Sequence, residues 1–430
     1  MNEPKVGGYR WTVVALLFFA TTINYLDRQI IGYLKDTLAG EFHWSDTDYG
    51  HLVAIFQTAY ALGLLLFGWI IDKIGTKVGY TVSIVIWSIA AMLHAAVRST
   101  FGFVVARTAL GVGESGNFPA AIKTVAEWFP KRERAFATGL FNSGANIGAV
   151  VAPILVPWLL GAYSWQTAFM VTGALGFIWL IFWLILYEIP SRHKKVTAAE
   201  LEFINSDTDE VVVSSGDGTK VNWLKLLSIR QTWTFVVGKF LTDPIWWFFL
   251  FWLPTYFAST FKLDLTKPTL PLVIIYSATT IGSIGGGYLS SWLIRKGWPA
   301  FRARKTAMFC FALCVVPIVL ARYATNMWQA VALISLAAAA HQAWSATIFT
   351  TASDMFPKKA VSSIVGIGGM AGAAGGIGFP LLVGYILDKY HALGHKDWGY
   401  NIIFLICGCA YLLAWLLMHL LSPKMKKVEL

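Results

Sequence analysis

Twelve apolar stretches, each long enough to cross a membrane, recur from one end of the chain to the other. About 20 apolar residues cross the hydrocarbon core as a helix, because a backbone in lipid must satisfy its own polar groups. The chain is 57% hydrophobic and only 13% charged, which excludes an ordinary soluble domain. The sequence therefore predicts an all-α membrane protein with twelve transmembrane helices. These lie at residues 11–33, 48–71, 78–97, 101–123, 135–161, 166–187, 231–259, 268–294, 304–322, 326–350, 361–387 and 399–421.

The basic residues are shared unequally between the two sides of the predicted membrane. If the N-terminus lies inside, the even-numbered connections and both tails hold most lysines and arginines, among them Lys131 and Lys424. Basic connections stay in the cytoplasm, so both termini are predicted to be cytoplasmic. The net charge of +11 thus reflects topology, and no nucleic-acid partner is expected. We expect a monomeric, multi-pass protein of the plasma membrane, embedded in the lipid bilayer and without a removable signal peptide.

A long polar connection at residues 189–230 divides the predicted helices into two sets of six. It is rich in Ser, Gly and Asp, as in Ser214–Gly218, and is too short to bury a core of its own. The predicted organisation is a six-helix bundle at 1–188, a cytoplasmic linker at 189–230 and a second six-helix bundle at 231–430.

The second set of helices repeats the first at one recognisable place. An offset of 227 residues maps Glu127-Trp128-Phe129-Pro130 onto Asp354-Met355-Phe356-Pro357, and it places His341 opposite Glu114. The two bundles are therefore predicted to be pseudo-symmetric. Transporters built from repeated halves hold substrate and coupling-ion sites near the midplane between the halves.

Ionisable residues occur inside the predicted membrane segments. Arg107 and Glu114 are seven residues apart, so both project from nearly one stripe of a helix. A charge at the bilayer centre costs about 2.5 to 3.5 kcal/mol, and such residues usually face a wet cavity or a partner. Counted along its helix, Asp27 shares the level of Arg107, which allows an Asp27–Arg107 pair with Glu114 deeper in the membrane. A purely structural salt bridge is the alternative.

Several uncharged polar residues also fall within apolar segments. Gln57 and Tyr60 lie in the second segment, and Asn142 and Asn146, four residues apart, share a face of the fifth. The two asparagines could reach a polar solute, or they could join neighbouring helices by hydrogen bonds. His341 likewise either belongs to the site or is a structural, hydrogen-bonded histidine.

The seventh segment holds Lys239, Asp243 and Pro244. Lys239 and Asp243 stand at positions i and i+4 of a helix and can pair with one another. Pro244 predicts a kink, which suits a helix that bends during gating. Whether the pair is functional or structural stays open at this stage.

The second segment ends in a turn rich in glycine and charge, with Gly68, Asp72, Lys73, Gly75 and Lys77. Glycine allows two backbones to approach closely. A carboxylate beside two cations at a tight cytoplasmic turn can clamp one helix end to another. These residues are the predicted cytoplasmic gate.

Three sets of residues carry a resemblance to a known family. With its twelve segments and the Gly68–Lys77 loop, the chain resembles the major facilitator superfamily. Within that superfamily, the chain resembles the anion:cation symporter family at three places. These are Tyr25-Leu26-Asp27-Arg28, the stretch from Arg107 to Glu114, and Glu127-Trp128-Phe129-Pro130. The runs Asn142–Ala149 and His341–Ser345, the latter including Trp344, look most like bacterial hexuronate transporters.

The resemblance implies roles for single residues. Asp27 and Glu114 would be protonation sites, and Arg107 would tune these acids. Arg28 would bind or gate a substrate carboxylate, and Tyr60 would line the site. Members of the family move organic anions, many of them driven by protons.

We therefore expect proton-coupled import of a hexuronate such as glucuronate or galacturonate, by alternating access, across a bacterial inner membrane. The substrate hydroxyls would be bound by residues from both bundles, namely Gln57, Asn142, Asn146, His341 and Gln342, with Trp344 beside them. The first alternative is another organic anion: an aldonate, an aldarate or a dicarboxylate. A phosphate-ester exchanger is less expected, because no intramembrane arginine is expected after residue 230, Arg304 and Arg322 standing at the two ends of their segment.

Enzyme chemistry is not expected of this chain. The sequence has no HExxH, no Gly-x-Ser-x-Gly and no Cys/His cluster. The four cysteines all lie in apolar helices, which favours inert buried thiols. No catalytic residue, metal or cofactor is predicted, and the expected partners are a small organic anion and protons.

Overall fold

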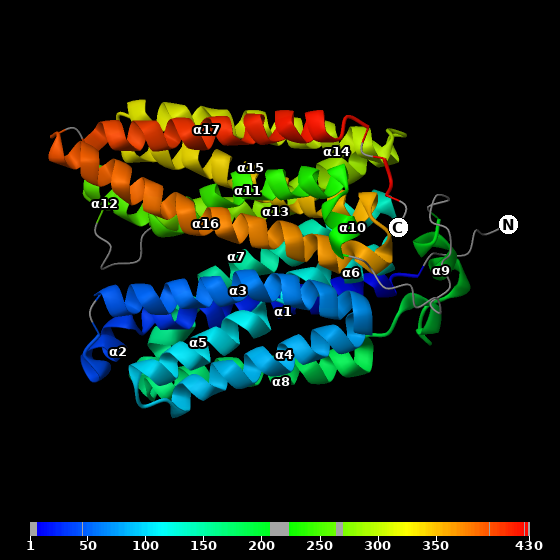
Figure 1. The fold of residues 1–430 in the computed structure, drawn as a ribbon, viewed down its shortest axis with the longest axis horizontal. Coiled ribbons are helices and arrows are strands. Elements are labelled where there is room, and N and C mark those ends of the chain that lie inside the picture. The colour runs from blue at the N-terminus through cyan, green and yellow to red at the C-terminus, as the bar shows by residue number, and fades with distance from the viewer. Residues whose placement is uncertain are drawn as a thin grey trace.

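The protein is helical throughout the part of the chain that the computed structural model describes, which is residues 7–44, 46–206, 223–263, 270–394, 396–424 and 426–428. The long helices run roughly parallel to the long axis of the molecule (Figure 1). Both termini lie at one end, called the terminus end below, and α2 and α12 lie at the other. The predicted Ser214–Gly218 stretch is outside the described residues.

The helices from α1 to α8 form a first group on one side of Figure 1. Their bounds are α1 Tyr9–Tyr33, α2 Lys35–Phe42, α3 Asp46–Ile74, α4 Thr76–Leu93, α5 Thr100–Glu114, α6 Asn117–Trp128, α7 Lys131–Ala162 and α8 Trp165–Leu186, with a 3₁₀ turn, η1, at His94–Ala96.

A second group, from α11 to α17, lies on the other side, with α7 near the boundary. Its bounds are α11 Arg230–Phe251, α12 Leu253–Phe261, α13 Leu270–Arg295, α14 Ala300–Val315, η3 Val316–Tyr323, α15 Met327–Met355, η4 Lys358–Ala360, α16 Val361–Ala392 and α17 Lys396–Leu421. The connection between the groups contains η2 Pro190–Arg192, α9 Ala198–Ile204 and α10 Trp223–Leu227.

Nine helical segments of the described chain are long and apolar enough to span a membrane. The other three expected spans are also helical, but they are charged or broken. α1 contains Asp27 and Arg28, and α11 contains Lys239 and Asp243. The twelve-span topology and the cytoplasmic location of both termini stay predictions.

The span expected at 101–123 is two helices rather than one. α5 ends at Glu114, and α6 begins at Asn117 after a turn at Ser115 and Gly116. Glycines let this region pack against α4, since a Cβ atom at Gly113 would lie 2.6 Å from the main-chain nitrogen of Trp87. Glu114 is thereby held at a helix end, well inside the first group.

Glycine also sets the contact between the two groups. A Cβ atom at Gly68 of α3 would lie 2.6 Å from the Ser362 carbonyl oxygen, so α3 and α16 touch along their backbones. A Cβ atom at Gly287 of α13 would lie 2.2 Å from the Ala135 carbonyl oxygen, so α13 and α7 do the same. Both contacts lie toward the terminus end, and they bring the two groups together there (Figure 1).

The described part of the connection between the groups is fastened to the first group. Arg10, at the start of α1, donates to Glu133 at 2.9 Å and lies 3.4 Å from Glu200 of α9. The Arg10 guanidinium also lies 4.7 Å from the centre of the Phe203 ring. The described part of the connection thus packs on the first group and is more than a solvated spacer.

Candidate transport site

A small cavity of about 80 Å³ lies between the two groups. The first group contributes Tyr25 and Arg28 from α1, Tyr60 from α3 and Asn142 from α7. The second group contributes Lys239, Asp243, Trp246 and Trp247 from α11 and His341, Gln342, Ser345 and Phe349 from α15. A cavity lined by charge, amide and aromatic groups from both groups is suited to a small polar ligand.

Arg28 joins this cavity to Glu114. The Nε atom of Arg28 donates to Oε2 of Glu114 at 2.9 Å, and its Nη2 atom donates to the Asn24 side-chain oxygen at 3.4 Å. Its guanidinium lies 4.4 Å from the centre of the Tyr60 ring. Glu114 is 0% exposed and does not line the cavity, so Arg28 is the link between this carboxylate and a ligand.

Asp27 and Arg107 lie near this pair but outside the cavity wall. Asp27 is 1% exposed, and neither carboxylate oxygen has a hydrogen-bond partner within the described chain. The Arg107 guanidinium lies 4.5 Å from the centre of the Phe56 ring, and the Arg28 guanidinium lies 5.3 Å from the same ring. Among described residues, the ion pair shown here joins Arg28 to Glu114, and neither Asp27 oxygen is hydrogen-bonded to Arg107.

The opposite wall of the cavity carries a second ion pair. Lys239 Nζ lies 2.7 Å from Oδ2 of Asp243, as the i,i+4 spacing predicts, and Lys239 also lies over the Phe349 ring. Both residues line the cavity. A Cβ atom at Gly372 of α16 would lie only 2.1 Å from Oδ2 of Asp243, so the missing side chain makes room for this carboxylate.

The predicted amides form a bridge between the two groups. The Asn142 side-chain amide donates to Oε1 of Gln342 at 2.9 Å and to the Ser283 hydroxyl at 3.2 Å. The Gln342 amide in turn donates to Asn146 at 3.5 Å. Asn142 and Gln342 line the cavity and Asn146 does not, so the contacts join helices while two of the three amides face the site.

His341 lies in the cavity wall as expected. Its ring stacks on Trp246, with centroids 5.3 Å apart, and its Nδ1 atom is hydrogen-bonded to the Tyr411 hydroxyl. Trp344 is fully buried and packs edge-on against Tyr411, outside the cavity wall. Gln57 is half-buried and also lies outside this wall.

Four residues line the cavity that the sequence analysis did not assign to ligand binding, namely Tyr25, Trp246, Trp247 and Ser345. The aromatic run after Pro244 was the available signal for the two tryptophans. Periodicity alone could not tell a ring that faces the cavity from a ring that faces lipid.

The predicted gate residue Asp72 connects the two groups at the terminus end. Its carboxylate pairs with Lys123 of α6 at 2.9 Å, and it accepts the main-chain N–H groups of Ser362 and Ser363 at 3.2 and 2.6 Å. These amides begin α16, where a helix leaves N–H groups without partners of its own. Asp72 of the first group thus caps a helix of the second.

Gly68 also meets the second group, at Ser362, whereas Lys73, Gly75 and Lys77 act within the first group. Gly75 has a φ of 87°, a left-handed conformation that favours glycine in the turn after α3. Lys77 pairs with Glu188 at 3.0 Å, and Lys73 lies over the Trp69 ring at 4.6 Å. The cation that pairs with Asp72 is Lys123 of α6, and the gate role of this turn stays a prediction.

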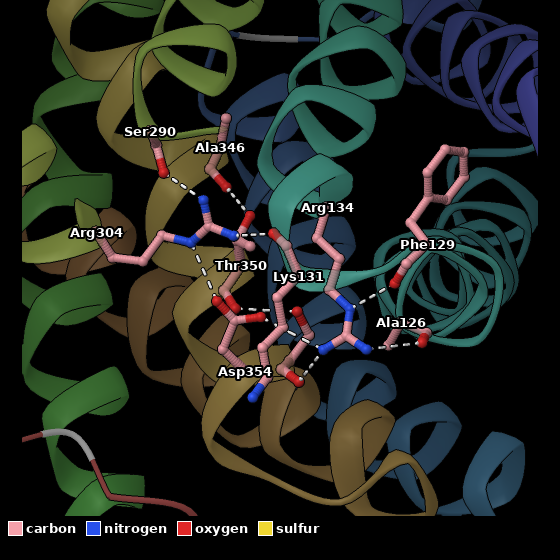
Figure 2. Close-up of polar contacts among 10 residues, drawn as sticks. Ala126, Phe129, Lys131, Arg134, Ser290, Arg304, Ala346, Thr350 and Asp354 are labelled. Atoms are coloured by element: carbon pink, nitrogen blue, oxygen red, sulfur yellow. Dashed lines mark hydrogen bonds and ion pairs between the residues drawn. The ribbon is translucent and has the colours of Figure 1, made fainter. Parts of the chain in front are cut away.

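A second contact between the groups centres on Asp354 of α15 (Figure 2). Arg134 of α7 lies 3.4 Å from Asp354 and donates to the Ser353 carbonyl at 3.1 Å. Arg304 of α14 lies 3.1 Å from Asp354 and donates to the Lys131 carbonyl of α7 at 2.6 Å. Both guanidinium groups therefore fasten one group to the other.

Arg304 corrects the sequence analysis. It falls within the candidate span Ala300–Tyr323, and its side chain is 1% exposed. From the sequence, Arg304 counts with the cytoplasmic connection, because the expected apolar segment begins at residue 304. Arg304 does not line the central cavity.

Comparison with known proteins decides the family. Residues 17–380 match the sequence profile of the Major Facilitator Superfamily. The chain belongs to the Major Facilitator Superfamily. It is 33% identical to the Hexuronate transporter of Escherichia coli (strain K12) over 386 residues, 89% of each chain. It is 34% identical to the Galacturonate transporter of Dickeya chrysanthemi over 285 residues, 66% of this chain and 82% of that one.

Solved structures of this superfamily share the fold. The proton:xylose symporter XylE, bound to 6-bromo-6-deoxy-D-glucose, gives a TM-score of 0.74 at 16% identity, covering 97% of each chain. The transporter FucP in its outward conformation gives 0.70 at 15% identity, covering 96% of this chain and all of that one. The protein is thus a multi-pass membrane transporter of the plasma membrane and not an enzyme, and the expected resemblance is confirmed.

Proposed function

We propose that this protein is a proton-coupled symporter of a hexuronate, such as glucuronate or galacturonate, that works by alternating access. The observation that carries the proposal is the Arg28–Glu114 ion pair of 2.9 Å at the edge of the central cavity. The named relatives that transport hexuronate and galacturonate support the same substrate class.

The pair offers a simple way to couple a proton to an organic anion. A substrate carboxylate that reaches Arg28 competes with Glu114 for the same guanidinium. Glu114 is fully buried, and an unpaired charge away from water is expensive, so a proton on Glu114 compensates for the loss of its partner. Substrate and proton would then bind together, with Asp27 as the second protonation site and Arg107 tuning both acids.

The rest of the cavity suits the remainder of a sugar acid. Asn142 and Gln342 present amides to the cavity, His341 presents its ring, and Trp246 and Trp247 offer apolar faces to a sugar ring. Gln57, Asn146 and Trp344 stay candidates that would have to join the site in another conformation.

The Asp72 and Asp354 contacts would form the cytoplasmic gate. If both termini are cytoplasmic, the two groups meet at the cytoplasmic end in this structure. Alternating access then requires these contacts to separate when the substrate is released inside. We expect the transporter to act as a monomer of twelve spans.

The test is uptake of labelled glucuronate and galacturonate by proteoliposomes under imposed pH gradients and voltages. We expect accumulation that follows an inward proton gradient and collapses with a protonophore. Accumulation that ignores the gradient would contradict coupling, and failure to take up either sugar acid would contradict the substrate.

Another organic anion is the second candidate. The chain is 29% identical over its whole length to the Probable galactarate/D-glucarate transporter GarP of Escherichia coli (strain K12). A dicarboxylate would use a second cation, and Lys239 stands on the opposite wall of the cavity. Competition of labelled uptake by a panel of hexuronates, aldonates and aldarates separates these substrates. A phosphate-ester exchanger is less favoured, because the second group gives the cavity a lysine and no arginine among the described lining residues.

A further inference from the structure

A second and larger cavity, of about 560 Å³, lies at the terminus end. It is bounded by the starts of α7 and α14, the end of α15 and the C-terminal tail, and it shares no lining residue with the central cavity. Its charged lining consists of Lys131, Arg304, Asp354, Lys424, Lys426 and Lys427. The transport function leaves this cavity without a role.

The charge of the cavity favours an anion. Five cationic side chains face one carboxylate, and that carboxylate, Asp354, is already shared by Arg134 and Arg304. A cleft lined by one sign of charge raises the local concentration of the opposite ion. Figure 2 shows Arg304, Lys131 and Asp354 meeting where the two groups join.

The lysines of the tail are positioned by their backbone. Lys305 donates to the carbonyl oxygens of Ser422 and Pro423 at 2.5 and 2.7 Å. Val428 donates its N–H to the Met355 carbonyl at 2.8 Å. The chain is thus fastened on both sides of Lys424 and Lys426, whose side chains remain exposed at the cavity.

The cavity lies where lipid headgroups would be. It opens at the start of the span Ala300–Tyr323, and Phe301, which lines it, is 42% exposed beside Trp298, which is 37% exposed. Exposed aromatic rings are typical of the membrane surface, and basic pockets between helix ends bind anionic headgroups. The first turn of α14, which no side chain caps, adds main-chain N–H groups toward an anion.

We propose that this cavity is a binding site for a phosphate-bearing anion that holds the two groups together at the terminus end. Lys131 comes from the first group, and the tail lysines come from the second. An anion that touches both fits only while the groups are closed at this end, so it shifts the population toward this conformation. The phosphate can belong to an anionic lipid or can be free in solution.

Basic tails also serve as topology signals, and this simpler role must be separated from binding. A topology signal needs charge alone, so any two lysines on this end would be equivalent. A site requires the lysines that line the cavity. The chain offers a matched pair of double variants: Lys424→Gln with Lys426→Gln in the tail, and Lys194→Gln with Lys195→Gln in the connection between the groups.

The experiment measures thermal unfolding of the purified full-length protein in detergent while phosphatidylglycerol, phosphatidylcholine or inorganic phosphate is added. We expect a saturable stabilisation that phosphatidylcholine does not give. At about 5-fold for each lysine, the Lys424→Gln/Lys426→Gln variant should need roughly 25-fold more of the anion, and the Lys194→Gln/Lys195→Gln variant should match the wild type. Stabilisation by phosphatidylglycerol alone identifies a lipid, and stabilisation by inorganic phosphate alone identifies a soluble anion.

The bridging role has its own readout. Spin labels on the two groups at the terminus end should report a larger closed population when the stabilising anion is added, and Lys131→Gln should weaken this response. The proposal is overturned if neither anion stabilises the protein, if the two double variants behave alike, or if the anion binds without increasing the closed population. None of these outcomes depends on which substrate is transported.

Discussion

The ion pairs at the central cavity and those at the terminus end differ in how many bonds hold each charge. In the cavity, each carboxylate meets a single cation in the described structure, Glu114 meeting Arg28 and Asp243 meeting Lys239. At the terminus end, Asp354 meets two arginines, and these arginines also donate to main-chain carbonyl oxygens. A single pair can be exchanged for a substrate or a proton, whereas a network of several bonds separates only when helices move.

The two terminus-end contacts also differ from each other in polarity. Asp72 brings a carboxylate from the first group to the N–H groups that begin α16. Around Asp354, guanidinium groups are brought to carbonyl oxygens instead, and Arg304 also donates to Ser290. The two contacts therefore join the same two groups with opposite charges, a carboxylate at one and guanidinium groups at the other.

The largest effect is expected from Glu114→Gln, which removes the exchangeable charge of the Arg28 pair. Proton-driven accumulation should be lost, because an amide cannot release a proton, while substrate exchange without a gradient should remain. Proteoliposome uptake with and without a pH gradient measures both. Glu202→Gln, at an exposed position of α9, is the control. Undiminished uphill uptake by Glu114→Gln would remove Glu114 from the mechanism.

The next largest effect is expected from Arg28→Lys. A lysine keeps the charge but loses the planar fork that can serve Glu114 and Asn24 together. Charge-assisted hydrogen bonds contribute about 1.5 to 3 kcal/mol, so substrate affinity should fall about 10- to 100-fold. Arg98→Lys, at a site bonded only to nearby loop carbonyls in the described structure, is the control for binding measurements. Equal affinities of the two variants would contradict a direct role for Arg28.

A smaller effect is expected on the conformational balance. Asp354→Asn leaves two buried guanidinium groups without their carboxylate, and it should disfavour the closed terminus end by about 2 kcal/mol. Asp72→Asn should disfavour it by only about 1 kcal/mol, because Lys123 keeps its bond to the Ile71 carbonyl. Distances between spin labels on the two groups measure both. If Asp72→Asn opens this end more than Asp354→Asn does, the number of bonds that each carboxylate makes does not determine how strongly its contact holds the two groups together.

The smallest effect is expected at Lys77 and Glu188, an ion pair within the first group whose side chains are 31% and 36% exposed. Glu188→Gln should change unfolding free energy by less than about 1 kcal/mol. Slight burial opposes ionisation, but the Lys77 hydrogen bond and the Ile189 N–H lower the pKa of Glu188 overall. The pair is therefore fully stabilising above the ordinary value of 4.5, and its contribution is lost as the pH falls through the lowered pKa. Thermal unfolding of both proteins at pH 7 and pH 3 should show the difference shrinking, and a growing difference would contradict this sign.

Features within one helix could be predicted from the sequence, and contacts between helices could not. The Lys239–Asp243 pair follows from its i,i+4 spacing, since both partners lie on α11. The spacing of Arg107 and Glu114 gave their positions along the chain but not the rotation of α5 against α1. In the structure the partner of Glu114 is Arg28 of α1, and only the family resemblance had singled out this arginine.

The polar contacts at the ends of the helices were harder still to predict from the sequence. Lys123 was not assigned to Asp72, because the two are 51 residues apart and meet only when α3 packs on α6. Arg304 stood at the edge of an apolar run, so composition could not tell a buried guanidinium from a solvated one. The apolar pattern predicts that helices cross the membrane. The polar contacts between them depend on the depth and the tilt of each helix in the membrane, which the pattern does not give.

The glycine at 372 has a consequence for what the opposite helix can carry. With only a hydrogen atom there, α16 leaves room for the carboxylate of Asp243, because a Cβ atom at 372 would lie 2.1 Å from Oδ2 of this residue. A methyl group at 372 would therefore displace the acid from its place beside Lys239. The position of an ion pair on α11 thus depends on a residue of α16 that has no side chain at all.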